Sequence, residues 1–75
     1  MKPVRRINMM TERVKRGLTV KKIGELFNVT PATVRSWEIG EYTPDGPHVQ
    51  ALCEFYNVTP TYLLAMNSDD HEKGK

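Results

Sequence analysis

A tetrapeptide that occurs twice, Asn-Val-Thr-Pro at residues 28–31 and again at 57–60, constrains this chain more than any other feature. Asparagine tolerates the left-handed backbone conformation that often ends a helix. Threonine is a favoured N-cap because its hydroxyl accepts a hydrogen bond from an unpaired backbone N–H, and proline suits the first helical position. Each copy therefore predicts the end of one helix followed at once by the start of the next.

Glycines, prolines and capping residues divide the rest of the chain in the same way and predict an all-α fold with five helices and no strand. The predicted helices cover residues 4–16, 20–27, 31–39, 46–56 and 60–66. The expected N-caps of the last four are Thr19, Thr30, Asp45 and Thr59, and Gly17 and Gly40 are expected to end two helices. One domain is expected over residues 1–66, with a basic arm at 1–6 and a polar, disordered tail at 67–75.

Apolar residues at helical spacing in these segments predict the core. They are Ile7, Met10 and Val14; Ile23, Leu26 and Phe27; Val29, Val34 and Trp37; Val49, Leu52, Cys53 and Tyr56; and Tyr62, Leu63 and Leu64. The aromatic residues Trp37, Tyr42, Phe55, Tyr56 and Tyr62 are scattered, so they are expected in the core or at a dimer surface rather than as a platform for single-stranded bases.

The chain has 75 residues and one cysteine, Cys53, so a disulfide within the chain is excluded and a small core is expected, to which dimerisation can add stability. His48 and His71 lie outside any metal-ligand pattern, and no metal, cofactor or small-molecule ligand is predicted. No apolar run approaches the roughly 18 residues of a membrane span, and the basic N-terminus lacks the apolar stretch of a signal peptide. A cytoplasmic protein is the simplest interpretation.

The distribution of charge is more informative than the net charge of +2. Residues 1–22 carry eight basic residues and one acidic residue, which gives +7, whereas residues 23–75 carry three basic and eight acidic residues, which gives −5. A chain polarised in this way is expected to orient in the field of a polyanion such as nucleic acid. The alternative is a solvated basic segment without a partner.

The predicted third helix has an outward face made of short side chains, which suits close approach to a major groove. The candidate base-reading residues on this face are Pro31, Ala32, Thr33, Arg35 and Ser36. Arg35 can fork onto guanine O6 and N7; the alternatives for it are a phosphate or an ion pair with Glu38.

The predicted second helix supports this interpretation through two features. Gly24 stands in its middle, where glycine costs about 1 kcal/mol relative to alanine, so close crossing by the third helix is expected in return. Lys21 and Lys22 lie in its first turn, where positive charge opposes the helix dipole, so a phosphate is a reasonable partner. The alternative is that both lysines are simply solvated.

The run from Gly17 to Glu38 resembles the helix-turn-helix of the lambdoid phage repressor and Cro family, also called XRE, and the likeness continues through Gly40 and Pro44 to Leu64. The motifs on which this resemblance rests are Thr-Val-Arg-Ser-Trp-Glu at 33–38 and Asn-Val-Thr-Pro-Thr-Tyr-Leu-Leu at 57–64. The resemblance implies a five-helix, lambda-repressor-like domain that reads bases with Pro31, Ala32, Thr33, Arg35 and Ser36. It also implies phosphate contacts by Thr19, Val20 and the backbone of residues 39–43, and a pair between Arg13 and Glu38.

This sequence departs from the family at several positions. Val20 replaces a frequent Gln, Ile39 and Glu41 stand where Arg or Lys is frequent, Asn28 replaces a usual Gly, and Glu12 falls where an apolar residue is usual. The missing phosphate contacts are expected to come from a flexible arm containing Lys2, Arg5 and Arg6. The full set of predicted phosphate contacts is Arg5, Arg6, Thr19, Lys21, Lys22 and Thr43.

The predicted function is sequence-specific binding of double-stranded DNA by a homodimer, as a repressor or regulator of a phage or prophage. The predicted dimer interface contains Tyr56, Tyr62, Leu63 and Met66. No enzymatic activity is expected, because no nucleophile–base constellation or carboxylate pair is visible. One alternative is a protein-interaction module on the same fold, antitoxin-like or anti-repressor-binding; another is an excisionase or MerR-like domain, which requires a wing of strands after Glu38.

Overall fold

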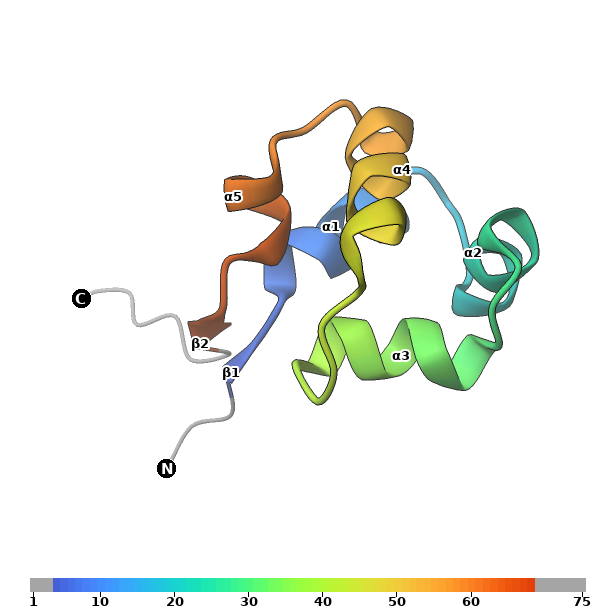
Figure 1. The fold of residues 1–75 in the computed structure, drawn as a ribbon. Helices are drawn as coiled ribbons and strands as arrows, with labels where there is room; N and C mark the ends of the chain where they lie inside the picture. Colours follow the sequence, from blue (N-terminus) through green and yellow to red (C-terminus); the bar gives the residue numbers. More distant parts are fainter. Residues whose placement is uncertain (1–3, 69–75) are drawn as a thin grey trace.

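The computed structural model describes residues 4–68 and contains five helices, which confirms the all-α class. The helices are α1 (Ile7–Lys15), α2 (Val20–Phe27), α3 (Pro31–Ile39), α4 (Gly46–Tyr56) and α5 (Pro60–Leu64). The predicted bounds of α2, α3 and α4 are confirmed, whereas α1 begins three residues later and ends one residue earlier than predicted, and α5 ends two residues earlier. In Figure 1, α3 lies along one side of the molecule with α2 at one end, and α4 stands above it.

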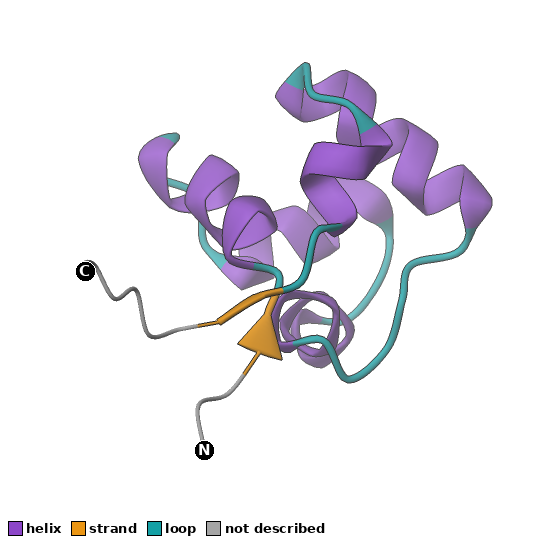
Figure 2. Cartoon of the chain, turned by 90° about the vertical axis from the view of Figure 1, so that its left-hand side faces the viewer, coloured by secondary structure: helices purple, strands orange, loops and turns teal. Residues whose placement is uncertain are grey.

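A short antiparallel ladder, which the sequence did not predict, joins the two ends of the domain. Strand β1 (Val4–Arg5) pairs with β2 (Asn67–Ser68), with Val4 opposite Ser68 and Arg5 opposite Asn67. The two strands lie side by side in Figure 2. The expected helix at residue 4, flexible arm and disordered tail are therefore wrong for these residues, because packing of α5 on α1 brings the two extended segments together. Residues 1–3 and 69–75 lie outside the described part.

Both copies of the repeated tetrapeptide fold as predicted. Asn28 and Asn57 adopt left-handed conformations, with φ of 61° and 59°. Thr30 and Thr59 cap α3 and α5 by accepting hydrogen bonds from backbone N–H groups three residues later. The other two expected caps, Thr19 and Asp45, are also confirmed.

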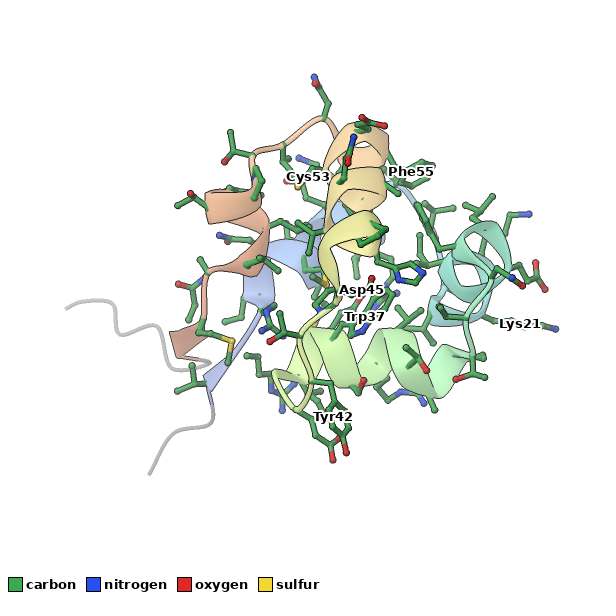
Figure 3. All side chains as sticks on the ribbon, in the orientation of Figure 1. Lys21, Trp37, Tyr42, Asp45, Cys53 and Phe55 are labelled. Carbon is green, nitrogen blue, oxygen red and sulfur yellow. The ribbon has the colours of Figure 1, made fainter. Side chains whose placement is uncertain are left out.

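The core lies where α1, α3, α4 and α5 meet and is completed by Ile23 of α2. Its buried apolar side chains are Met9, Ile23, Val34, Trp37, Leu52, Cys53, Tyr56 and Leu63, with Phe27, Val29, Val49 and Leu64 packed against them. Trp37 points from α3 toward α4 in Figure 3. The prediction was wrong for Leu26, which is 48% exposed, and for Val14, which is 57% exposed.

The inner face of α1 is rotated relative to the prediction. Met9 and Glu12 are buried, whereas Ile7 and Met10 are only half-buried. Glu12 occupies an inner position because its carboxylate accepts hydrogen bonds from Arg16 at 2.7 Å and from the Tyr62 hydroxyl at 2.7 Å. These bonds, with a further contribution from Lys15, lower the pKa of Glu12 to about 2. A polar network therefore takes the place of the apolar residue that is usual at this position.

Two of the residues predicted for a dimer interface are part of this core. Tyr56 is 2% exposed and Leu63 is fully buried, so the prediction that they face a second copy is wrong. Both fill the space between α4, α5 and α1 within one chain, because such a small domain needs its large apolar side chains for its own core.

The order of elements also excludes the alternative with a strand wing after Glu38. In the described part of the chain, α4 follows α3 directly, and the next strand is β2 at Asn67–Ser68. The excisionase or MerR-like interpretation is therefore wrong.

Candidate nucleic-acid interface

The outward face of α3 carries all five predicted base-reading residues. Pro31, Ala32 and Arg35 are exposed, and Thr33 and Ser36 are partly exposed. The opposite face of the same helix contributes Val34 and Trp37 to the core. The helix is thus anchored on one side and open on the other, and the structure brings the five side chains onto a single surface.

Hydrogen bonds within α3 orient its hydroxyl groups. The Ser36 hydroxyl donates to the backbone carbonyl of Thr33 at 2.7 Å. The hydroxyls of Thr30 and Thr33 lie 2.9 Å apart, and Thr30 Oγ1 also accepts from the Thr33 N–H at 3.1 Å. The small polar residues of the outward face are therefore held in defined orientations.

A hollow of about 440 Å³ lies between this face and the segment that follows α3. It is lined by Ala32, Thr33, Ser36, Trp37, Glu41 and Tyr42. Tyr42 is 65% exposed, and in Figure 3 it lies below the C-terminal part of α3, on the side away from α4. Of the two expected placements of Tyr42, the core is therefore wrong; the residue lies beside the outward face of α3, and the available signal was its place just after the helix-ending Gly40.

The turn between α2 and α3 brings the two helices into close contact, as Gly24 predicted. A Cβ on Gly24 would lie 2.6 Å from the backbone oxygen of Val29 and 3.3 Å from the nitrogen of Pro31. The first of these distances is shorter than real Cβ atoms essentially ever show, and the second is tighter than most. Glycine is therefore needed at this position for the turn to pack against α2.

The first turn of α2 presents two lysines to solvent. Lys21 and Lys22 are both exposed, and the Lys22 N–H is bonded to the capping hydroxyl of Thr19 at 3.0 Å. Lys21 points away from the body of the molecule in Figure 3. It also lines a second hollow of about 430 Å³ around the turn, together with Gly24, Glu25, Asn28, Val29, Thr30 and Pro31.

The pair between Arg13 and Glu38 that the family resemblance implies is present. Arg13 donates to both carboxylate oxygens of Glu38, at 2.7 and 3.0 Å, and also to the carbonyl of Leu18 at 2.8 Å. The bidentate bond to Glu38 raises the pKa of Arg13. This pair joins α1 to the last turn of α3 and offsets the unfavourable placement of an acidic side chain at a helix C-terminus.

Arg6 does not belong to a flexible arm, and the prediction that it contacts phosphate is wrong. The residue is 5% exposed, and its guanidinium donates to the carbonyls of Trp37 and Tyr42 and to the hydroxyl of Thr43. Burial lowers its pKa. Sequence reasoning missed this role because its acceptors lie more than 30 residues away along the chain.

The basic N-terminal segment is consequently less available to a ligand than its charge suggests. Arg6, Arg13 and Arg16 bond to the protein itself, and Lys15 lies 3.1 Å from Glu12. Arg5 lies on β1 and is half-buried. The exposed basic side chains beside or on α3 in the described residues are Lys21, Lys22 and Arg35.

These features define the chain as a helix-turn-helix domain with an open recognition helix. A family model described as "Helix-turn-helix" matches residues 9–63, which is most of the chain. The protein belongs to this family, of the XRE type, and is a DNA-binding transcription regulator. No curated protein and no solved structure matches the chain with statistical significance.

The structure of residues 4–68 bears on membranes and metals as follows. None of the helices in that range has the length and apolar character needed to cross a membrane. In the same range, no three His, Cys, Asp or Glu residues are grouped so that they could hold a metal ion.

Proposed function

We propose that this protein is a repressor or regulator of a temperate phage or prophage that binds a near-palindromic operator as a homodimer. The observation that carries the proposal is the two-sided character of α3, which is anchored by Val34 and Trp37 and open at Ala32, Arg35 and Ser36. A face of short side chains bordered by one guanidinium is suited to the major groove.

The proposed contacts divide into two classes. Pro31, Ala32, Thr33, Arg35 and Ser36 meet base edges, and Arg35 forks onto a guanine. Lys21 and Lys22 meet phosphates, together with Thr19, Thr43 and Arg5. Arg6 is excluded from this set because its guanidinium is buried.

A dimer is proposed because an operator of two half-sites requires two recognition helices about 34 Å apart. Of the four residues first expected at its interface, Met66 is exposed, and Tyr62 is half-buried with its hydroxyl bonded to Glu12. Met66 is exposed near Gly40 and Val4, and Val4 and Ile39 are also exposed. We therefore place the proposed interface at the end of α5 and the β1–β2 ladder.

The base-reading proposal is tested with a duplex that the protein selects from a random-sequence pool. Arg35→Ala is expected to weaken binding to that duplex by about 1–3 kcal/mol and to leave binding to random DNA almost unchanged. Lys21→Ala is the contrasting variant, because it should weaken binding to the selected duplex and to random DNA alike and should flatten the salt dependence of the affinity. Equal losses on both duplexes for Arg35→Ala would make it a phosphate contact.

The regulatory and dimer proposals need separate measurements. Footprinting on phage and host DNA is expected to show two half-sites one helical turn apart that overlap a promoter. Sedimentation with and without the selected duplex gives the number of copies bound. A protein that stays monomeric on its site at high concentration would contradict the dimer.

A further inference from the structure

The C-terminal end of α3 receives its positive charge from a distant part of the chain. Within residues 31–39, all of which are described, the last turn contains no lysine or arginine. The Arg6 guanidinium instead donates to the carbonyl of Trp37 at 2.7 Å. A cation at this end of a helix satisfies an unpaired carbonyl and matches the helix dipole.

The same guanidinium holds the segment that leaves α3. It donates to the carbonyl of Tyr42 at 3.0 Å and to the hydroxyl of Thr43 at 2.9 Å. On the other side, the N–H groups of Glu41 and Tyr42 both donate to the carbonyl of Ser36, at 2.9 and 3.3 Å. Residues 41–43 are thus tied to α3 through Ser36 and to the N-terminal segment through Arg6.

Arg6 is itself held at a defined position. Its backbone N–H donates to the carbonyl of Glu38 at 2.7 Å, and it directly follows β1, which pairs with β2. Among the described residues, its Nε has no hydrogen-bond partner, and the bonds to residues 37, 42 and 43 come from the two terminal nitrogens. The fork of the guanidinium therefore spans the helix end and the following segment at once.

We propose that Arg6 is a positioning residue for DNA binding, which holds residues 41–43 in the conformation that meets the DNA beside the recognition helix. This inference rests on the proposed function, in which Thr43 contacts a phosphate. Burial excludes a direct contact between Arg6 and DNA. Its effect is to remove the cost of ordering Tyr42 and Thr43 when DNA binds, because the segment is already fixed in the free protein.

Arg6→Lys is the test variant, because it keeps the charge and loses the planar fork that reaches several acceptors. Arg16→Lys is the matched control. Like Arg6, Arg16 donates to a distant backbone carbonyl, that of Tyr56, and to a side-chain oxygen, that of Glu12, but these bonds join the end of α1 to the end of α4. Both variants are measured at a temperature at which circular dichroism shows them fully folded.

The experiment uses the duplex selected by the wild-type protein from a random pool. Arg6→Lys is expected to bind it about tenfold more weakly, because the segment must now be ordered on binding. Ethylation interference should weaken only at the phosphates next to the end of α3, and amide hydrogen exchange at Tyr42 and Thr43 should become faster. Arg16→Lys should change affinity less than twofold and leave the interference pattern intact, whatever its loss of thermal stability.

Three results would overturn the proposal. The first is an Arg6→Lys affinity and interference pattern equal to those of the wild type, and the second is a loss equal to that of Arg16→Lys. The third is a wild-type protein that selects no duplex from the pool, which would remove the proposed function itself. The first two results leave that function standing, so the two failures are distinguishable.

Discussion

The two Asn-Val-Thr-Pro joints have the same local structure and deliver helices with different roles. In each, asparagine is left-handed, valine donates to the carbonyl five residues earlier, and threonine caps the next helix. Both helices bury the residue three positions after the proline, Val34 in α3 and Leu63 in α5. Yet α3 spans nine residues and exposes Ala32 and Arg35 on its outward face, whereas α5 spans five residues and its Tyr62 bonds to the Glu12 carboxylate. The tetrapeptide thus determines how one helix stops and the next begins, and its neighbours determine what the second helix does.

Two differences around the joints account for the different roles of α3 and α5. The valine of the first joint lies against Gly24, and the corresponding residue at the second joint is Cys53, which has a side chain. The first turn can therefore approach its preceding helix more closely than the second. In addition, consecutive residues of α1 anchor the two helices, because Arg13 bonds to Glu38 of α3 and Glu12 bonds to Tyr62 of α5.

The largest effect is expected when the bond between Arg13 and Glu38, which joins α3 to α1, is removed. Arg13→Met leaves the buried Glu38 carboxylate without its partner and should lower the free energy of unfolding by about 3 kcal/mol. Lys15→Met is the control, because Lys15 is exposed and the buried Glu12 keeps its bonds to Arg16 and Tyr62 without it, so the loss should be less than about 1 kcal/mol. Urea denaturation measures both. Similar losses for the two variants would mean that α3 does not depend on this anchor.

The close approach at the first joint is tested by Gly24→Ala. The added Cβ meets the backbone oxygen of Val29, so a net loss of about 2 kcal/mol is expected even though alanine favours the helix. Gly46→Ala is the control, since a Cβ there has nothing within 4 Å. Thermal melts of both variants give the comparison, and a stable Gly24→Ala protein would show that the two joints do not differ in this respect.

The anchor of α5 is tested by its pH dependence. Because the folded-state pKa of Glu12 is about 2, below its ordinary value of 4.5, its stabilisation is complete above about pH 5 and is lost as the pH falls toward 2. Tyr62→Phe removes a hydrogen bond to a charged group and should cost about 1.5 kcal/mol at pH 7.

Melting temperatures from pH 2 to pH 7 measure this effect. The stability difference between the wild type and Tyr62→Phe is expected to shrink below about pH 4.5. Glu12→Gln should reduce the fall in melting temperature between pH 5 and pH 2. A difference that is constant with pH would mean that the Tyr62 hydroxyl does not act through the Glu12 carboxylate.

The smallest effect concerns the N-cap threonine, which the two joints share. Thr30→Ala and Thr59→Ala each remove one N-cap and should each cost about 1 kcal/mol. Urea denaturation of both variants is expected to give losses within about 0.5 kcal/mol of each other. A much smaller loss for Thr59→Ala would show that burial of Leu63, rather than the cap, positions α5.

The features that the sequence predicted correctly depend on residues close together in the chain. The caps at Thr19, Thr30 and Thr59 act on N–H groups three residues away. The close turn at Gly24 involves a carbonyl five residues away. Local signals of this kind were sufficient for three helices and for the open face of α3.

The features that were missed depend on distant partners. Glu12 is buried because Tyr62, 50 residues later, supplies a hydroxyl, and this rotates the inner face of α1. Arg6 resembles any other member of a basic run until Trp37 and Tyr42 are placed around it. Apolar spacing identified Tyr56 and Leu63 as buried candidates but could not separate the core of one chain from an interface between two.

The internal bond of Ser36 has a consequence for the base contact that is proposed for this residue. Because its hydroxyl proton is given to the Thr33 carbonyl, the oxygen has only lone pairs left to offer. In the major groove, lone pairs suit the exocyclic amino groups of adenine and cytosine and are repelled by guanine O6 and thymine O4. Under the proposed function, we therefore expect the base that Ser36 meets to be an adenine or a cytosine, so that a hydrogen bond inside the protein leaves two of the four bases at that position of the proposed operator.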